Sequence, residues 1–281
     1  MATGSGKEVL PPALTSNSDP PPVFDGTSRL YISYTCPYAQ RVWITRNCKG
    51  LQDKIKLVPI DLRDRPAWYK EKVYPTNKVK LGDDPNYWYC LLPGLFIQNS
   101  YADCEPQDPA KKEFAEELFS YTGSFSKAIN STLKGEADEA GAAFDYIETA
   151  LSKFEDGPFF LGQFSLADIS YAPFIERFRP TLLEFKKYDI TAGRPKLAAW
   201  MEEMNKMEAY NQTRRDPKQH VETYRKRYAV RLISETLAFH VHHKTKLLSP
   251  DFRVIAPGFL NHVADRISYE KTTPSVSIFL F

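Results

Sequence analysis

Residues 30–41 read Leu-Tyr-Ile-Ser-Tyr-Thr-Cys-Pro-Tyr-Ala-Gln-Arg, and they are the most informative part of the chain. An apolar-rich run typical of a β-strand is followed by the turn Thr35-Cys36-Pro37 and then by residues typical of a helix. The order strand, turn, helix predicts that Cys36 lies at the amino end of a helix. Backbone N–H groups and the helix dipole stabilise a thiolate there, and the thiolate is the nucleophile of sulfur exchange.

The position three residues after Cys36 is as informative as the cysteine itself. A dithiol redox protein has a second cysteine there, but this chain has Ala39. A mixed disulfide on Cys36 must then be released by an external thiol, and glutathione is the abundant one in a reducing cell. The motif therefore predicts glutathione-dependent thiol chemistry. The alternative is that Cys36 is a small buried residue packed beside a proline turn.

Composition limits the classes of partner. The chain has 281 residues, which suggests two domains or one large one, and its apolar fraction of 42% is enough for a packed core. The net charge is only +2, and basic residues alternate with acidic ones, so no nucleic acid partner is expected. We interpret the basic cluster at 225–227 as a solvated helix end. No apolar run approaches 18 residues, so no membrane partner is expected.

The cysteines and the amino terminus bear on the compartment. Cysteines at positions 36, 48, 90 and 104 have neither metal-ligand spacing nor a disulfide framework, which indicates a reducing compartment. We expect Cys48 to be a packing residue. Residues 1–27 are rich in proline and contain acidic residues, unlike a transit peptide, so they predict a disordered arm on a cytoplasmic protein.

The first part of the chain has the pattern of an α/β unit. Apolar runs predict strands at 29–34 and 55–60, with a helix at 38–49 between them. Pro59 places the second strand at an edge or near its own end. A further helix is expected to begin at 65–69, since proline suits a first turn. This order implies parallel strands joined by a right-handed crossover, as at the start of a thioredoxin-like domain.

From Asp108 onward the pattern is helical. Apolar residues at spacings of three or four predict helices from 108 to about 133, from 140 to 154, from Ser165, and around 197–204. We interpret these stripes as core. An alternative is that some of their aromatic residues line a ligand pocket: Tyr171, Phe174, Phe178 and Trp200. The fold class predicted is an α/β domain followed by an all-α domain.

Residues 165–168, Ser-Leu-Ala-Asp, match a capping box. Ser165 accepts from the first turn of the helix, and Asp168 accepts from the backbone of the capping residue. Phe164 and Ile169 occupy the positions of a hydrophobic staple. We interpret the motif as a folding device, and expect Asp168→Ala to cost about 1 kcal/mol, as for loss of a cap.

Together these residues resemble a plant lambda-class glutathione transferase, a class that is omega-like in using cysteine. The resemblance covers residues 25–79 and 106–228. It rests on four stretches: 35–43, 61–68, 74–79 and 157–169. It implies a thioredoxin-like, glutathione-binding domain at 28–105 and an all-helical glutathione transferase (GST) C-terminal domain at 106–228.

The resemblance also implies an activity and a site. The protein would be a thiol transferase that removes glutathione from mixed disulfides, with Cys36 as the nucleophile and glutathione as cosubstrate. Its other substrates would be small electrophilic or glutathionylated aromatic molecules, often flavonoid-like. The family implies a monomer. The residues that would bind glutathione are Pro37, Tyr38, Arg65, Lys78 and Val79.

The sequence departs from the family pattern after Val79. The family continues with a cis-proline, two strands and a Glu-Ser pair that binds the γ-glutamyl end of glutathione. Here Lys80 follows, and 80–105 contains no Glu-Ser pair. We predict only a short strand there, at 95–97. The thioredoxin-like domain is therefore expected to be incomplete, with an unpaired sheet edge and an uncovered apolar face.

Residues 229–281 are a second atypical stretch. They contain four of the five histidines but no set of ligands that completes a metal site, so no metal is predicted. We interpret 80–105 and 229–281 as products of altered splicing or of an error in the gene model. Two alternative functions stay open: a non-catalytic protein that binds flavonoid-like molecules, and an inactive isoform lacking part of the glutathione site.

Overall fold

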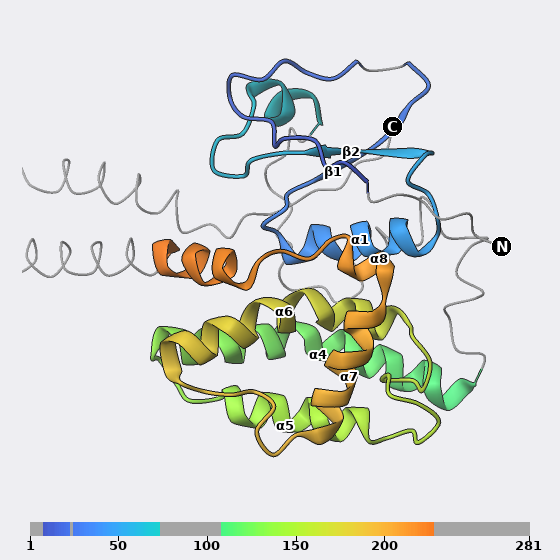
Figure 1. Ribbon diagram of the computed structural model, residues 1–281, viewed down its shortest axis with the longest axis vertical. Helices are drawn as coiled ribbons and strands as arrows, with labels where there is room; N and C mark the ends of the chain where they lie inside the picture. Colours follow the sequence, from blue (N-terminus) through green and yellow to red (C-terminus); the bar gives the residue numbers. More distant parts are fainter. Residues whose placement is uncertain (1–7, 23–24, 74–107, 228–281) are drawn as a thin grey trace, which may run out of the picture.

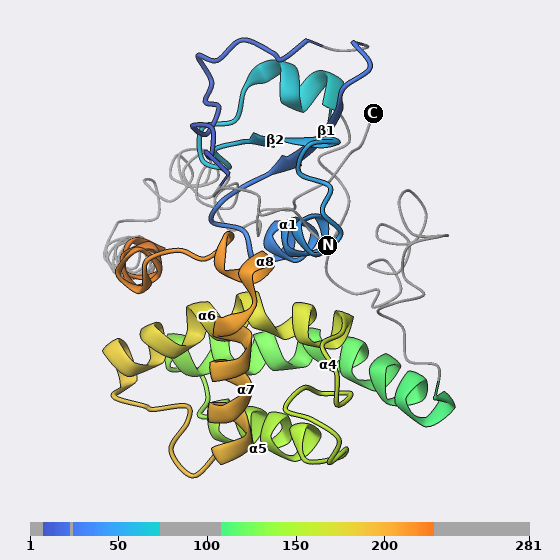
Figure 2. The same ribbon diagram turned by 45° about the vertical axis from the view of Figure 1, so that its right-hand side comes forward.

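A computed structural model describes residues 8–22, 25–73 and 108–227. A small sheet lies above a layer of helices, and helix α1 lies between the two (Figure 1). The same layering is visible after a turn of 45° (Figure 2). Helix α1 therefore contacts both the sheet and the helical layer, and packing against both fixes the positions of the residues at its ends.

The sheet has the predicted parallel topology. Strands β1 (Ser28–Ile32) and β2 (Ile55–Pro59) pair in parallel, and helix α1 (Pro37–Cys48) connects them. Pro59 ends its strand, as expected for a residue without a backbone donor. The helix expected to begin at 65–69 is a helical turn at 67–73, and its second part is the π-helical turn η1 (Tyr69–Val73).

Both faces of the sheet are covered by described residues, contrary to the expected uncovered face. Side chains alternate along β1, so Leu30 and Tyr31 point to opposite faces. Leu30 belongs to a cluster between the sheet and α1. This cluster includes Ile32, Ala39, Trp43, Ile55 and Leu57. Tyr31 belongs to a second cluster, with Val58, Ile60, Tyr69 and Val73. The turn at 67–73 therefore supplies a cover that the sequence pattern did not indicate.

The amino-terminal arm pairs with β2. Leu14 forms a parallel bridge with Ile60: its amide donates to the Pro59 carbonyl (2.8 Å), and its carbonyl accepts from the Asp61 amide (2.9 Å). The Leu14 side chain packs against the second cluster. Residues 8–22 thus differ from the prediction of a disordered arm over 1–27. The physical reason is that pairing satisfies backbone groups at the sheet edge.

Three side-chain contacts fix this arm further. The Glu8 carboxylate accepts two hydrogen bonds from the buried guanidinium of Arg46, both 2.8 Å. Tyr34 donates its hydroxyl to the Pro11 carbonyl (2.6 Å), and the Trp68 indole donates to the Ser18 carbonyl (2.8 Å). The arm is therefore part of the first domain's packing.

The second domain is helical, as predicted. Its helices are α4 (Pro109–Lys134), α5 (Ala140–Leu151), α6 (Leu166–Lys186), α7 (Pro195–Lys206) and α8 (Glu208–Asn211), followed by a helical segment at 217–227. Asp108 caps α4 by accepting from the Ala110 amide (2.8 Å), and Gly135 ends it in the left-handed conformation, at φ 76°. Helix α5 ends at Leu151, three residues before the predicted end.

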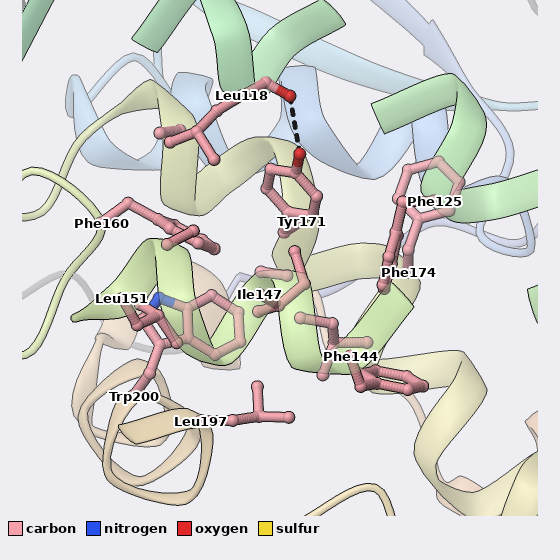
Figure 3. Close-up of a cluster of buried hydrophobic side chains, with 14 of the residues drawn as sticks. Leu118, Phe125, Phe144, Ile147, Leu151, Phe160, Tyr171, Phe174, Leu197 and Trp200 are labelled. Atoms are coloured by element: carbon pink, nitrogen blue, oxygen red, sulfur yellow. Dashed lines mark hydrogen bonds between the residues drawn. The ribbon is translucent and has the colours of Figure 1, made fainter. Parts of the chain in front are cut away.

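The apolar stripes of α4, α5, α6 and α7 meet in one core (Figure 3). Tyr171 lies inside it, and its hydroxyl donates to the Leu118 carbonyl at 2.6 Å. The interpretation of the stripes as core is confirmed. The largest fully buried side chains of this core are Trp200, Tyr171, Phe125, Phe144, Phe160 and Phe178.

The capping box at the start of α6 is present, and its acid does more than predicted. Ser165 accepts from the Ala167 amide, and Asp168 accepts from the Ser165 amide (2.8 Å). The fully buried Asp168 carboxylate also accepts from the Ser165 hydroxyl (2.9 Å), the Phe160 amide (3.2 Å) and the Trp200 indole (2.8 Å). We therefore expect Asp168→Ala to cost more than the about 1 kcal/mol predicted from the capping box, because that box includes only the bond from the Ser165 amide.

Several predictions fall outside the described residues: the binding roles of Lys78 and Val79, the departure at Lys80, the strand at 95–97 and the histidines of 229–281. Within the described ranges, no helix is long and apolar enough to cross a membrane. The same ranges contain no group of three or more metal-ligating side chains suited to a metal ion.

Candidate active site

Cys36 is the N-cap residue of α1, as the sequence predicted. Its amide donates to the Ser33 carbonyl (3.0 Å), and its carbonyl accepts from the Gln40 amide (3.1 Å), the first bond of the helix. Pro37 takes the first helical position, where its missing N–H costs no hydrogen bond. The turn from β1 thus places one thiol where the first N–H groups of α1 converge.

The pKa of the Cys36 thiol depends on more than the helix end that the sequence predicted would stabilise its thiolate. Cys36 is buried, and burial raises the pKa of its thiol. The Ala39 amide, the charge of Arg177, the Tyr38 amide and the charge of Arg41 all act to lower that pKa. The helix end therefore favours the thiolate as predicted, but burial is the largest single effect and opposes it.

Tyr38 connects the first turn of α1 to the second domain. Its ring meets Phe174 of α6 edge-on, with centroids 5.2 Å apart. The Arg41 guanidinium lies over the same Phe174 ring, 4.7 Å from its centroid. Burial raises the pKa of the Tyr38 hydroxyl, so this group is protonated at neutral pH. The turn that holds Cys36 is thereby packed directly against α6.

Arg65 lies in the loop after β2, and is half-buried. Its Nε donates to the Leu62 carbonyl at 3.1 Å. Its predicted role in binding glutathione stays a prediction, as do those of Pro37 and Tyr38. The structure brings Cys36, Pro37 and Tyr38 together in one turn of chain.

Helix α1 is docked on the second domain through polar side chains that are buried. Arg41 donates through Nε (3.0 Å) and Nη2 (2.6 Å) to the Ser170 carbonyl of α6. Asn47 donates to the Ala209 carbonyl of α8 (3.2 Å). Hydrogen bonds of fixed direction allow few orientations of α1, so they set its position more narrowly than apolar packing would.

Gln40 is the centre of this polar interface. Its Nε2 donates to the Glu176 carboxylate (2.8 Å) and to the Thr213 hydroxyl (3.1 Å), while its Oε1 accepts from Arg177 (2.5 Å). Sequence reasoning gave no role to these residues. The signal that could have found them is the charged pair at 176–177 inside the buried stripe of α6, because charges are rarely buried without a partner.

The aromatic residues offered as an alternative pocket are core residues. Tyr171, Phe174, Phe178 and Trp200 are all buried and belong to the same apolar cluster. The polar atoms of two of them are used internally, Tyr171 on the Leu118 carbonyl and Trp200 on Asp168. Nothing in their packing favours a ligand pocket over a core.

Comparison with known proteins agrees with this fold. Two family models match: "Glutathione S-transferase, N-terminal domain" over residues 30–79, and "Glutathione S-transferase, C-terminal domain" over 130–203. The solved structure of glutathione transferase Omega 1C from Trametes versicolor superposes with a TM-score of 0.58. It is 23% identical and covers 73% of this chain and 97% of its own, so it shows the shared fold.

Two curated relatives from Arabidopsis thaliana are much more similar in sequence. "Glutathione S-transferase L2, chloroplastic" is 57% identical over 224 residues, which is 77% of this chain and 76% of the relative. "Glutathione S-transferase L3" is 55% identical over 226 residues, which is 79% of this chain and 96% of the relative. The chain therefore belongs to the glutathione S-transferase family, and within it to the lambda class.

Proposed function

We propose that the protein is a glutathione-dependent thiol transferase, or deglutathionylase, in which Cys36 is the nucleophile. The observation that carries this proposal is the placement of one cysteine at the N-cap of α1, where the amides of Tyr38 and Ala39 favour its ionised form. A helix amino terminus is a recurrent setting of reactive cysteines. The family supplies glutathione as cosubstrate.

The position of Cys48 limits how a mixed disulfide between Cys36 and glutathione can be released. Cys48 is exposed, contrary to its predicted packing role, and is the last residue of α1. Twelve residues of helix place it about 18 Å from Cys36, at 1.5 Å per residue. A disulfide needs α-carbons within about 7 Å of one another. Cys48 therefore does not resolve a disulfide on Cys36. Cys90 and Cys104 lie outside the described residues.

The reaction balances with glutathione as the external thiol. The Cys36 thiolate attacks the glutathionyl sulfur of a mixed disulfide, forming a Cys36–glutathione disulfide and releasing the substrate as its thiolate, which takes a proton. A glutathione thiolate then attacks the glutathionyl sulfur on Cys36. Glutathione disulfide forms and the Cys36 thiolate is regenerated. The substrate disulfide is reduced, and two glutathione units are joined in the product.

The remaining parts of the proposal come from the resemblance to the lambda class. Pro37, Tyr38, Arg65, Lys78 and Val79 bind glutathione. The substrates are small glutathionylated or electrophilic aromatic molecules. The protein acts as a monomer in the cytoplasm, a reducing compartment that agrees with its cysteine usage.

The test compares two cysteine variants. Cys36→Ser should reduce glutathione-dependent cleavage of a small glutathione mixed disulfide to the uncatalysed rate. Cys48→Ser is the matched control, because it changes the exposed cysteine at the other end of α1, and should leave the rate unchanged. Cleavage by Cys36→Ser at the parent rate would contradict the proposal.

A second measurement separates binding from chemistry. We expect the parent chain and Cys36→Ser both to be retained on immobilised glutathione and eluted by free glutathione. If the parent chain passes through unretained, glutathione is not a ligand of this protein, and the thiol of Cys36 serves another chemistry.

A further inference from the structure

Arg177 of α6 lies against the first turn of α1. Its side chain is 4% exposed. Nη1 donates to the Gln40 side-chain oxygen (2.5 Å) and to the Pro173 carbonyl (2.6 Å). Gln40 is the residue whose amide makes the first helical bond to the Cys36 carbonyl. Arg177 is therefore fixed to the one turn of α1 that begins at Cys36.

The other terminal nitrogen of Arg177 is not used. Nη2 is buried and donates to no acceptor in the part of the chain that the structure describes. The neighbouring carboxylate, on Glu176, is already engaged with Gln40 (2.8 Å), the Arg215 amide (3.0 Å) and His220 (3.0 Å). Among the described residues no carboxylate lies at ion-pair distance from Arg177, and burying a guanidinium without such a partner is costly.

We propose that Arg177 is a positioning residue for Cys36: its charge, held on the second domain, is the counter-charge of the thiolate. The inference rests on the proposed function, because it concerns the ionised form of the proposed nucleophile. Ionisation of Cys36 would give the buried cation an anion to face, and the cost of each buried charge would be offset by the other.

The charges around Cys36 support this assignment. The charges of Arg177 on α6 and of Arg41 on α1 both act to lower the pKa of the Cys36 thiol, and Tyr38 interacts with that thiol from its own helix. Arg177 has a stronger lowering effect on the pKa of Cys36 than Arg41. The groups that face Arg177 itself are Glu176, Tyr210, Arg215, His220 and Tyr224.

The assignment has a structural consequence. Arg177 belongs to the helical domain and Cys36 to the sheet domain, so docking of α1 on α6 becomes a condition for the reactive form of the thiol. Gln40 links the two domains at this point, because its side-chain oxygen accepts from Arg177 and its side-chain nitrogen donates to Glu176.

The test measures the ionisation of Cys36 directly. Alkylation of Cys36 by iodoacetamide is followed from pH 5 to pH 10 by mass spectrometry of the peptide that contains it. We expect Arg177→Gln to raise the apparent pKa by about one unit, with about a tenfold slower reaction at acidic pH and the same plateau at high pH. Arg177→Lys keeps the charge and should restore the parent profile.

A purely structural role predicts a different outcome. Arg194→Gln is the matched control, since Arg194 is a buried arginine of the same domain that pairs with Asp145, and its profile should equal that of the parent. Arg177→Met, which keeps the apolar stem, is the second neutral variant if Arg177→Gln does not fold. An unchanged profile in a folded neutral variant, or equal shifts in the Lys and Gln variants, would overturn the assignment.

The assay uses no glutathione, so the two proposals fail separately. If the parent chain has no transferase activity, but Arg177→Gln still raises the apparent pKa of Cys36, the proposed function is refuted and the role of Arg177 stands. An active parent with an unshifted Arg177→Gln profile refutes the role of Arg177 alone.

Discussion

Replacing Asp168 by alanine should destabilise the helical domain far more than replacing Ser165. The Asp168 carboxylate accepts from the Ser165 amide, the Ser165 hydroxyl, the Phe160 amide and the Trp200 indole. Alanine leaves three N–H donors without their acceptor, at sites that are buried. Each stranded donor costs about 1–3 kcal/mol, and partial relaxation of the site brings the expected total to about 3–5 kcal/mol.

Ser165→Ala is the matched comparison, because it removes the cap and keeps the acid. It should cost about 1 kcal/mol, the usual value for a lost N-cap. The measurement is equilibrium urea unfolding followed by far-ultraviolet circular dichroism, with the slopes compared so that a change in midpoint reflects stability. Equal losses for the two alanine variants would refute the reasoning, since Asp168 would then act only through the capping box.

The pH dependence gives a second check on Asp168. Burial raises the pKa of this carboxyl from 3.8 to about 6. The folded chain therefore holds the proton more tightly than the unfolded chain, and the group's stabilising contribution is present at low pH and lost as the pH rises through about 6. Asp168→Asn cannot titrate, so its stability deficit relative to the parent should shrink by roughly 2–2.5 kcal/mol between about pH 4 and pH 7. A constant deficit over that range would contradict a raised pKa.

Three further predictions concern other parts of the molecule. Glu8→Gln should lower the unfolding midpoint in urea by the equivalent of about 1–2 kcal/mol, because the buried Arg46 guanidinium loses its anion; an unchanged midpoint would show that this ion pair contributes nothing to stability. Tyr171→Phe keeps the ring and removes only the hydroxyl bonded to Leu118, so thermal unfolding should reveal a loss of about 1 kcal/mol; a loss as large as that of Tyr171→Ala would mean that packing was disturbed instead. Mass spectrometry of native tissue should find no peptides from 80–104 if that stretch is an error of the gene model, and their recovery would establish it as part of a real product.

The parts of this fold that the sequence predicts are those encoded within a few residues. A strand, a Cys-Pro turn and a helix are apparent in 30–41, and α1 begins at Pro37 as expected. The capping box of α6 spans four residues, and both of its bonds are present. The apolar stripes predicted the long helices, because a helical period repeats every three or four positions.

The predictions that failed depend on contacts distant in sequence. The arm was expected to be disordered because its composition is rich in proline, yet Glu8 pairs with Arg46, 38 residues away. Cys48 was expected to pack, but it is exposed at the end of α1. The capping-box motif also gave no sign of the bond that the Trp200 indole donates to Asp168 from 32 residues away.

The sequence alone determined that one thiol begins a helix, since the residues that make this turn are neighbours in the chain. The surroundings of that thiol depend on how the folded chain packs. Gln40 meets Arg177 across 137 residues, and the burial that opposes ionisation of Cys36 exists only once α1 is packed between the sheet and the helical domain. Local patterns fix hydrogen bonds along the backbone, whereas the electrostatic environment of a side chain depends on which distant groups the closed fold brings beside it.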